Sequence, residues 1–203
     1  MIHRDNIENF PIVYNKNGFI IKKSERNNYI TEFEIENKNL YMEKLLHLSL
    51  IDILYSVNKD VVDIYKLKVV ETNDNYGEAN VFVIFKHLFA DIGIPQYHSF
   101  LNIKIKKTLD ESFITFYIKS NTNYENINEY IDDDEIYKQT EQLKVKNVTC
   151  YCKLITPHKI KVENHIYLNN QKLVVVDFIE KICFQLLYKM FIRSKVFIEM
   201  MYK

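Results

Sequence analysis

Apolar and polar residues alternate along several segments of the chain, and this spacing places the two kinds of side chain on opposite faces of a β-strand. The clearest case is residues 101–106 followed by 114–119, where Leu, Ile and Phe alternate with Asn, Lys, Thr and Tyr. We predict a hairpin there, turned at residues 108–111. Asn15-Lys16-Asn17-Gly18 between two apolar runs favours a second hairpin near the N-terminus. Further strands are expected at residues 29–36, 61–71, 148–154 and 160–168.

Apolar residues spaced three and four apart predict about three helices. The segments are residues 39–57, 81–92 and 177–201, the last a long amphipathic helix. The middle segment leaves an alternative open, because its Val-Phe-Val-Ile-Phe run would suit a buried strand equally well. Asp177 followed three residues later by Glu180 resembles an N-cap with its reciprocal partner, and it predicts where the last helix begins.

These elements predict a single α+β domain over residues 1–203. We expect a mainly antiparallel sheet of about six or seven strands, with about three helices packed mostly on one face. Residues 121–142 have little apolar periodicity and contain the run Asp132-Asp133-Asp134-Glu135, so we predict a mobile acidic loop there. The strands on its two sides look like members of one sheet, which argues against a domain boundary.

Composition narrows the functional classes. The 203 residues are 47% hydrophobic, and Lys and Arg number 27 against 27 Asp and Glu, which argues against disorder and against a globally basic nucleic-acid-binding protein. Only three glycines are present, too few for a dinucleotide fingerprint or a P-loop. The abundance of Ile, Lys, Asn, Tyr and Phe indicates an AT-rich genome, such as that of some viruses.

Other signals concern the compartment. The three cysteines have no C-x-x-C spacing, and the N-terminal residues form no apolar signal region. Charged residues interrupt the longest apolar runs, which argues against a membrane span. We expect an intracellular chain, cytoplasmic or virion-associated, that needs no cofactor.

The last helix carries the strongest signal, because its apolar arc is wider than one sheet surface needs. If part of this arc were exposed, it would mark a protein partner or self-association; if not, all of it is core. The first hypothesis is therefore a non-catalytic structural or scaffolding protein that acts by protein–protein contact. The interface residues would be Phe184, Tyr188, Ile192 and Val196.

A second hypothesis is a nucleic-acid-binding accessory protein, since lysines neutralise phosphates and tyrosine rings stack on unpaired bases. The scarcity of arginine argues against it, and a solvated face with the acidic loop as its counter-charge explains the pattern equally well. The residues would share the outward face of the sheet: Lys104, Lys106, Tyr117, Lys119, Tyr151, Lys153, Lys161, His165 and Tyr167.

Metal and catalytic sites have weaker support. Glu32, Glu34 and Glu36 would share one strand face and so suggest a hard cation, but such a row is more often an edge strand protected by charge. Cys150 and Cys152 fit buried small hydrophobes better than zinc ligands. The sequence has no nucleophile elbow and no H-E-x-x-H motif. We therefore predict no metal and no catalytic residue.

Overall fold

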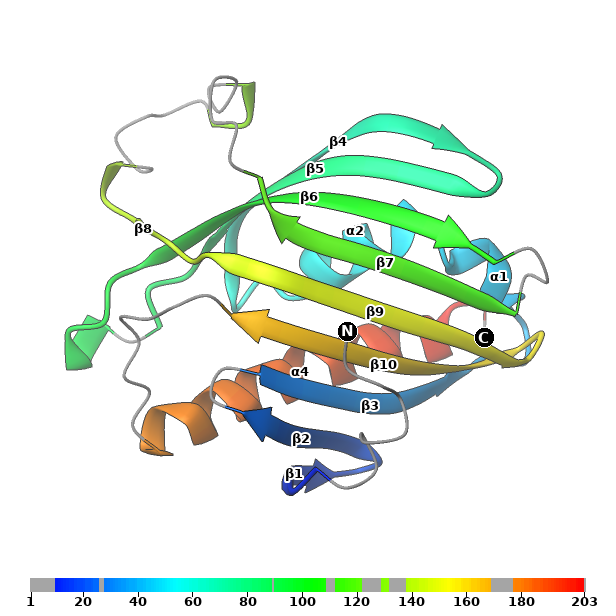
Figure 1. Cartoon of the computed structure of the whole chain (residues 1–203), viewed down its shortest axis with the longest axis horizontal. Helices are drawn as coiled ribbons and strands as arrows, with labels where there is room; N and C mark the ends of the chain where they lie inside the picture. The colour runs from blue at the N-terminus through cyan, green and yellow to red at the C-terminus, as the bar shows by residue number, and fades with distance from the viewer. Residues whose placement is uncertain are drawn as a thin grey trace.

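The computed structural model of the chain describes residues 10–25, 28–88, 90–108, 112–121, 129–131, 138–168 and 177–202. In this part of the chain ten strands form one sheet, with the helices behind it in the view of Figure 1. The strands are β1 (Ile12–Lys16), β2 (Phe19–Glu25), β3 (Asn28–Glu36), β4 (Val62–Asn73), β5 (Tyr76–Phe85), β6 (Tyr97–Lys107), β7 (Phe113–Ser120), β8 (Glu141–Gln142), β9 (Val145–Thr156) and β10 (Lys159–Leu168). The helical elements are α1 (Met42–Leu45), α2 (Leu48–Ser56), the short 3-10 element η2 (Ala90–Ile92) and α4 (Asp177–Met200).

The strand order is β1-β2-β3-β10-β9-β7-β6-β5-β4, and every neighbouring pair along it is antiparallel. The two-residue strand β8 joins β6 in parallel. The three N-terminal strands therefore reach the rest of the sheet through one junction, where β3 pairs with β10 from Glu36 opposite Lys159 to Asn28 opposite Tyr167.

The expected sheet of six or seven strands was wrong, since the structure has ten. The main error lies at residues 81–92, which we expected to be helical; residues 76–85 form strand β5, so the strand alternative is the right one. The cause is burial on both faces. Val81 packs into one apolar cluster, and Phe82 and Ile84 pack into another on the opposite face. A strand without a solvated face loses the alternation that identifies strands.

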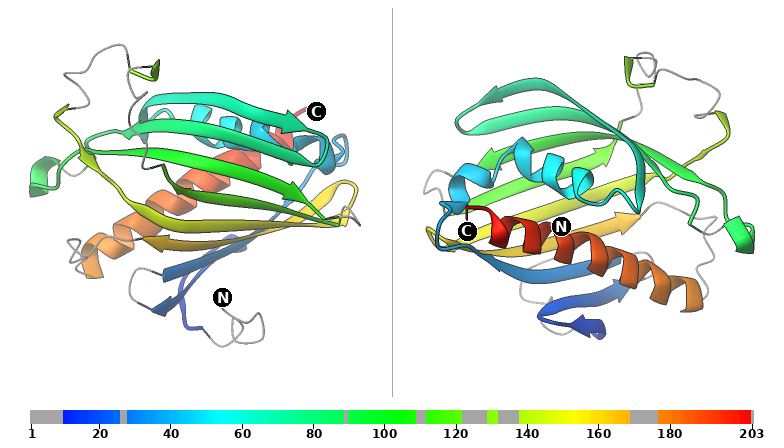
Figure 2. Two further views of the ribbon diagram at one scale, coloured as in Figure 1. Left: turned by 45° about the horizontal axis from the view of Figure 1, so that its top comes forward. Right: turned by 180° about the vertical axis from the view of Figure 1, so that it is seen from behind.

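Helices α2 and α4 lie side by side on one face of the sheet, as the view from behind shows (Figure 2). We call this the inner face and the opposite one the outer face. Directly paired residues of neighbouring strands share a face, so the register assigns each strand position to one of the two.

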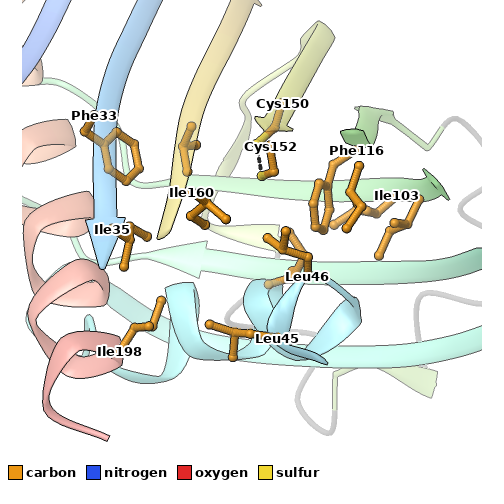
Figure 3. Close-up of a cluster of buried hydrophobic side chains, with 14 of the residues drawn as sticks. Phe33, Ile35, Leu45, Leu46, Ile103, Phe116, Cys150, Cys152, Ile160 and Ile198 are labelled. Carbon is orange, nitrogen blue, oxygen red and sulfur yellow. Dashed lines mark hydrogen bonds between the residues drawn. The ribbon is translucent and has the colours of Figure 1, made fainter. Parts of the chain in front are cut away.

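The core lies between the inner face and the helices. Phe33 and Ile35 of β3, Ile160 of β10 and Phe116 of β7 point into it, and Ile198 of α4 closes it from the helix side (Figure 3). Each large apolar side chain buried in this way contributes roughly 1.5–3 kcal/mol of transfer free energy. The core therefore holds α4 on the sheet.

A smaller apolar cluster covers the outer face of β5 and β6. It joins Phe82, Ile84 and Phe100 to Tyr130 and Ile131, both buried. These last two residues belong to the segment that we expected to be a mobile acidic loop. Most of that segment, residues 122–128 and 132–137, lies outside the described residues.

His98 stands beside this outer cluster. It is buried, its ring stacks on Phe82, and its Nδ1 lies 2.8 Å from the Thr140 hydroxyl. Burial lowers the pKa of His98 from 6.5 to about 4, because a buried imidazole resists becoming charged.

The depressed pKa of His98 predicts a loss of stability in mild acid. Below about pH 6.5 the unfolded chain binds a proton at this residue that the folded chain excludes, so the free energy of unfolding falls between pH 7 and pH 4 by about 3 kcal/mol from this residue alone. Urea unfolding at both pH values measures the loss. The variant His98→Gln should show a smaller loss by about that amount; an equal loss in both proteins would contradict the assignment.

Candidate ligand site

An aromatic stripe of α4 packs onto the inner face of the N-terminal strands. The Phe184 ring meets Tyr29 at 5.4 Å between centroids, and Phe191 meets Phe33 at 5.3 Å. Between them, Tyr188 lies 5.7 Å from Phe19. The stripe is thus covered by the sheet of its own chain.

The four predicted interface residues separate accordingly. Phe184 is buried, while Tyr188 and Ile192 are half-buried. Val196 lies on the outer side of α4 and is 43% exposed. The structure therefore does not bring these four side chains together into one exposed patch.

The C-terminal half of α4 is clamped by polar contacts. Asn37 donates from Nδ2 to the carbonyl oxygens of Ile198 at 2.6 Å and Met201 at 2.9 Å. Asn58 donates to the carbonyl of Met190 at 3.2 Å. In addition, Arg193 forms an ion pair with Asp60. The bonds from Asn37 satisfy carbonyls at the C-terminal end of the helix, where the i+4 partner is missing.

The N-terminal half of α4 is held at Glu180. Its Oε1 accepts hydrogen bonds from Lys23 Nζ and Tyr29 Oη, both at 2.6 Å. Burial on its own would raise the pKa of Glu180, but the hydrogen bonds from Lys23 and Tyr29 outweigh it and hold this pKa below its usual value. Glu180 therefore binds to the sheet as a carboxylate, whereas the sequence predicted it as a partner of the helix N-terminus.

The sheet surface beneath α4 is apolar and uncharged. By register, the inner-face residues of β3, β10, β9 and β7 include no charged side chain in the part of the chain that the structure describes. One buried polar pair interrupts the middle of this surface: Asn164 of β10 donates from Nδ2 to Thr31 Oγ1 of β3 at 2.8 Å.

Two thiols line the same surface. The sulfur atoms of Cys150 and Cys152 are 3.7 Å apart, and both residues are buried. The contact with Cys150, together with burial, raises the pKa of Cys152 well above its usual value, and burial raises the pKa of Cys183. Protonated thiols are poor nucleophiles and poor metal ligands.

Glu32, Glu34 and Glu36, which the sequence placed on one strand face, do lie together on the outer face of β3. Lys22 lies 2.5 Å and Lys161 3.4 Å from Glu32, and Lys159 lies 2.7 Å from Glu34. Lysines of neighbouring strands thus neutralise Glu32 and Glu34. Among the described residues, no group of three His, Cys, Asp or Glu side chains is placed to hold a metal ion.

The nine residues proposed for nucleic-acid binding do share the outer face, as the register of β6, β7, β9 and β10 shows. Several of their charges are already paired. Lys104 bonds to Glu78 at 3.0 Å, and His165 lies 2.6 Å from Glu163. Lys161 shares Glu32 with Lys22. Of the other members, Lys106, Tyr117, Lys119 and Lys153 are exposed, and Tyr151 and Tyr167 are half-buried.

Two surface hollows lie away from α4. One, of about 370 Å³, lies between α2 and β4 and is lined by the stacked Tyr55 and Tyr65. The other, of about 570 Å³, lies between α1 and the β4–β5 turn, and its lining is mostly polar. The space between α4 and the sheet is occupied by the side chains of the core.

Comparison with known proteins shows which solved structures share this fold. No family model and no curated protein sequence matches the chain. Among solved structures, human StAR-related lipid transfer protein 5 superposes with a TM-score of 0.68 at 10% identity, over 99% of this chain and 91% of that one. The chain has a START-like helix-grip fold. Human STARD10 superposes with a TM-score of 0.61 at 9% identity, over 95% of this chain and 74% of that one. The lipid transfer and protein localization domain of human StarD13 superposes with a TM-score of 0.57 at 11% identity, over 92% of this chain and 86% of that one.

The START-like fold corrects the hypotheses on function. The structural or scaffolding hypothesis and the nucleic-acid-binding hypothesis were both wrong, because the fold is that of StAR-related lipid transfer protein 5 and of the lipid transfer and protein localization domain of StarD13. A viral origin and association with a virion have no support. None of the described helices is long and apolar enough to cross a membrane.

Sequence reasoning missed the polar pair inside the START-like grip. Residues 160–168 were expected to form a strand, and in it Asn164 shares one face with the apolar residues Ile160, Val162 and Ile166. The sequence does contain a signal for this pair, because Asn164 is polar at a position where the alternation of the strand predicts an apolar residue.

The contrast between the two ends of α4 generates a prediction. Glu180→Gln removes the carboxylate that accepts from Lys23 and Tyr29, so amide hydrogen exchange at residues 177–187 should rise about ten-fold, because hydrogen bonds to charged groups contribute about 1.5–3 kcal/mol. Residues 194–200, held by the clamp, should keep their protection. The control is Lys181→Gln at the exposed neighbouring position. A uniform rise along the whole of α4 would contradict the separate attachment of its two halves.

Proposed function

We propose that the chain binds a lipid-like, apolar small molecule between the inner face of the sheet and α4. The observation that carries the proposal is the uncharged, apolar surface of four central strands beneath a helix that is clamped mainly at one end. An apolar ligand gains roughly 25 cal/mol for each Å² of apolar surface removed from water, and such a surface offers it no unpaired charge.

The similar structures support the same proposal. The three similar structures each superpose on 92% or more of this chain, and two of them are named for lipid transfer. Their names describe those proteins and not this one. What they add is that a helix gripped by a curved antiparallel sheet is an architecture used for lipid transfer.

Binding requires that α4 move, since core side chains occupy the space beneath it. The N-terminal half is the part free to do so. It depends on Glu180 with Lys23 and Tyr29, on one exposed hydrogen bond from Asn17 to Tyr188, and on apolar packing. Asn37, Asn58 and Arg193 hold the C-terminal half. We therefore propose that the ligand enters at the N-terminal end of α4, with the clamp as the hinge.

Fluorescence of N-phenyl-1-naphthylamine, a neutral dye that brightens in apolar surroundings, tests the proposal. The wild-type chain should bind the dye saturably, with close to one dye per chain. Glu180→Gln should bind it with an association rate several-fold faster, because opening of α4 limits entry.

Lys181→Gln serves as the matched control and should leave the association rate at the wild-type value. Adsorption of the dye to exposed apolar side chains, such as Met200, would not depend on Glu180. Absence of saturable binding, or equal association rates in all three proteins, would refute the proposal.

A further inference from the structure

The buried pair of Thr31 and Asn164 lies at a defined place under α4. On one side of the pair, Tyr29 lies opposite Ile166 in the sheet, and its ring contacts Phe184 of α4. On the other side, Phe33 lies opposite Val162, and its ring contacts Phe191 of α4. The two polar side chains therefore lie beneath the two turns of α4 between these aromatic contacts. Thr31 has no exposed surface, and Asn164 is 4% exposed.

The surroundings of the pair exclude a charged partner. No inner-face residue described on β3, β10, β9 or β7 is charged. On the inner face, Lys23 is the nearest cation by register, because it pairs with Tyr29, and Glu180 already neutralises it. An ionised carboxylate, phosphate or ammonium buried here would lose its hydration without a counter-charge, at a cost of several kcal/mol.

The pair retains unused hydrogen-bonding capacity. An asparagine amide offers two N–H donors and an accepting oxygen, and a threonine hydroxyl also donates. Within the described residues, the side-chain hydrogen bonding of Asn164 consists of the single bond from Nδ2 to Thr31. Oδ1 of Asn164 and the Thr31 hydroxyl proton remain to accept from and donate to one further neutral group.

Stability alone does not explain the pair. Replacing both members of a buried hydrogen-bonded pair with apolar groups of similar shape is nearly neutral or even stabilising. The adjoining positions on the same face, Val162 and Ile166 on β10 and Phe33 on β3, are apolar.

We propose that Thr31 and Asn164 select an uncharged ligand with a hydroxyl headgroup, such as a long-chain alcohol or a sterol, over lipids with ionised headgroups. This inference rests on the proposed function. The ligand hydroxyl donates to Asn164 Oδ1 and accepts from the Thr31 hydroxyl, while its apolar part lies along Cys150, Cys152 and the other inner-face residues.

Displacement of N-phenyl-1-naphthylamine by three ligands of equal chain length tests the selection: 1-dodecanol, dodecane and dodecanoate at pH 8. In the wild-type chain, dodecanol should bind at least ten-fold more tightly than dodecanoate. In the double variant Thr31→Val, Asn164→Leu, the dissociation constant of dodecanol should rise about ten-fold, the size expected for two lost neutral hydrogen bonds, while that of dodecane stays the same or falls.

A matched control removes the same two residue types from the outer face. Asn147 donates to Thr149 at 3.4 Å there, so Asn147→Leu, Thr149→Val should leave all three dissociation constants unchanged. If the double variant fails to fold, the single variant Thr31→Val replaces it. We expect this single variant to raise the dissociation constant of dodecanol several-fold.

The outcomes separate the two proposals. If the wild-type chain binds the dye but dodecanoate competes as well as dodecanol, or if the double variant weakens dodecanol and dodecane equally, the hydroxyl selection is wrong and apolar ligand binding stands. If the wild-type chain does not bind the dye saturably, both proposals are wrong.

Discussion

The structure depends on the burial of one stripe of α4 against the inner face of the sheet. Phe184, Tyr188 and Phe191 supply that stripe, and the rings that receive them come from β2 and β3. Without the helix, the inner face of a ten-stranded sheet would expose Ile, Phe and Cys side chains to water. The helix and the three N-terminal strands therefore stabilise each other, and they form one wall of the candidate ligand site.

Polar and apolar contacts have different roles along α4. The apolar stripe determines which side of the helix faces the sheet, but it is non-directional and tolerates sliding. Directional bonds from Asn37 and Asn58 then fix the C-terminal half, and Glu180 fixes the other end through Lys23 and Tyr29. A grip that is strong at one end and lighter at the other suits a protein whose interior has to open without unfolding.

Much of the sheet could be predicted from the sequence, because strands with one solvated face keep their alternation; the hairpin of β6 and β7 is an example. Strand β5 could not, since Phe82 and Ile84 are covered by Tyr130 and Ile131 from a segment about fifty residues away. Helix α4 was expected at the right place, but its wide apolar arc gave no indication of how much of it the sheet would cover. The candidate site depends on the register of β3 against β10, which pairs residues more than 120 positions apart and leaves no local pattern.

That same pairing of β3 with β10 has a consequence for biogenesis. During synthesis β3 leaves the ribosome long before its partner strand exists, and its inner-face residues Tyr29, Phe33 and Ile35 have neither β10 nor α4 to cover them. Contacts between distant segments form late and slow folding, and exposed strand edges meanwhile invite aggregation. The alternating glutamates Glu32, Glu34 and Glu36 on the other face of β3 keep the waiting strand hydrated and discourage its pairing with a second copy.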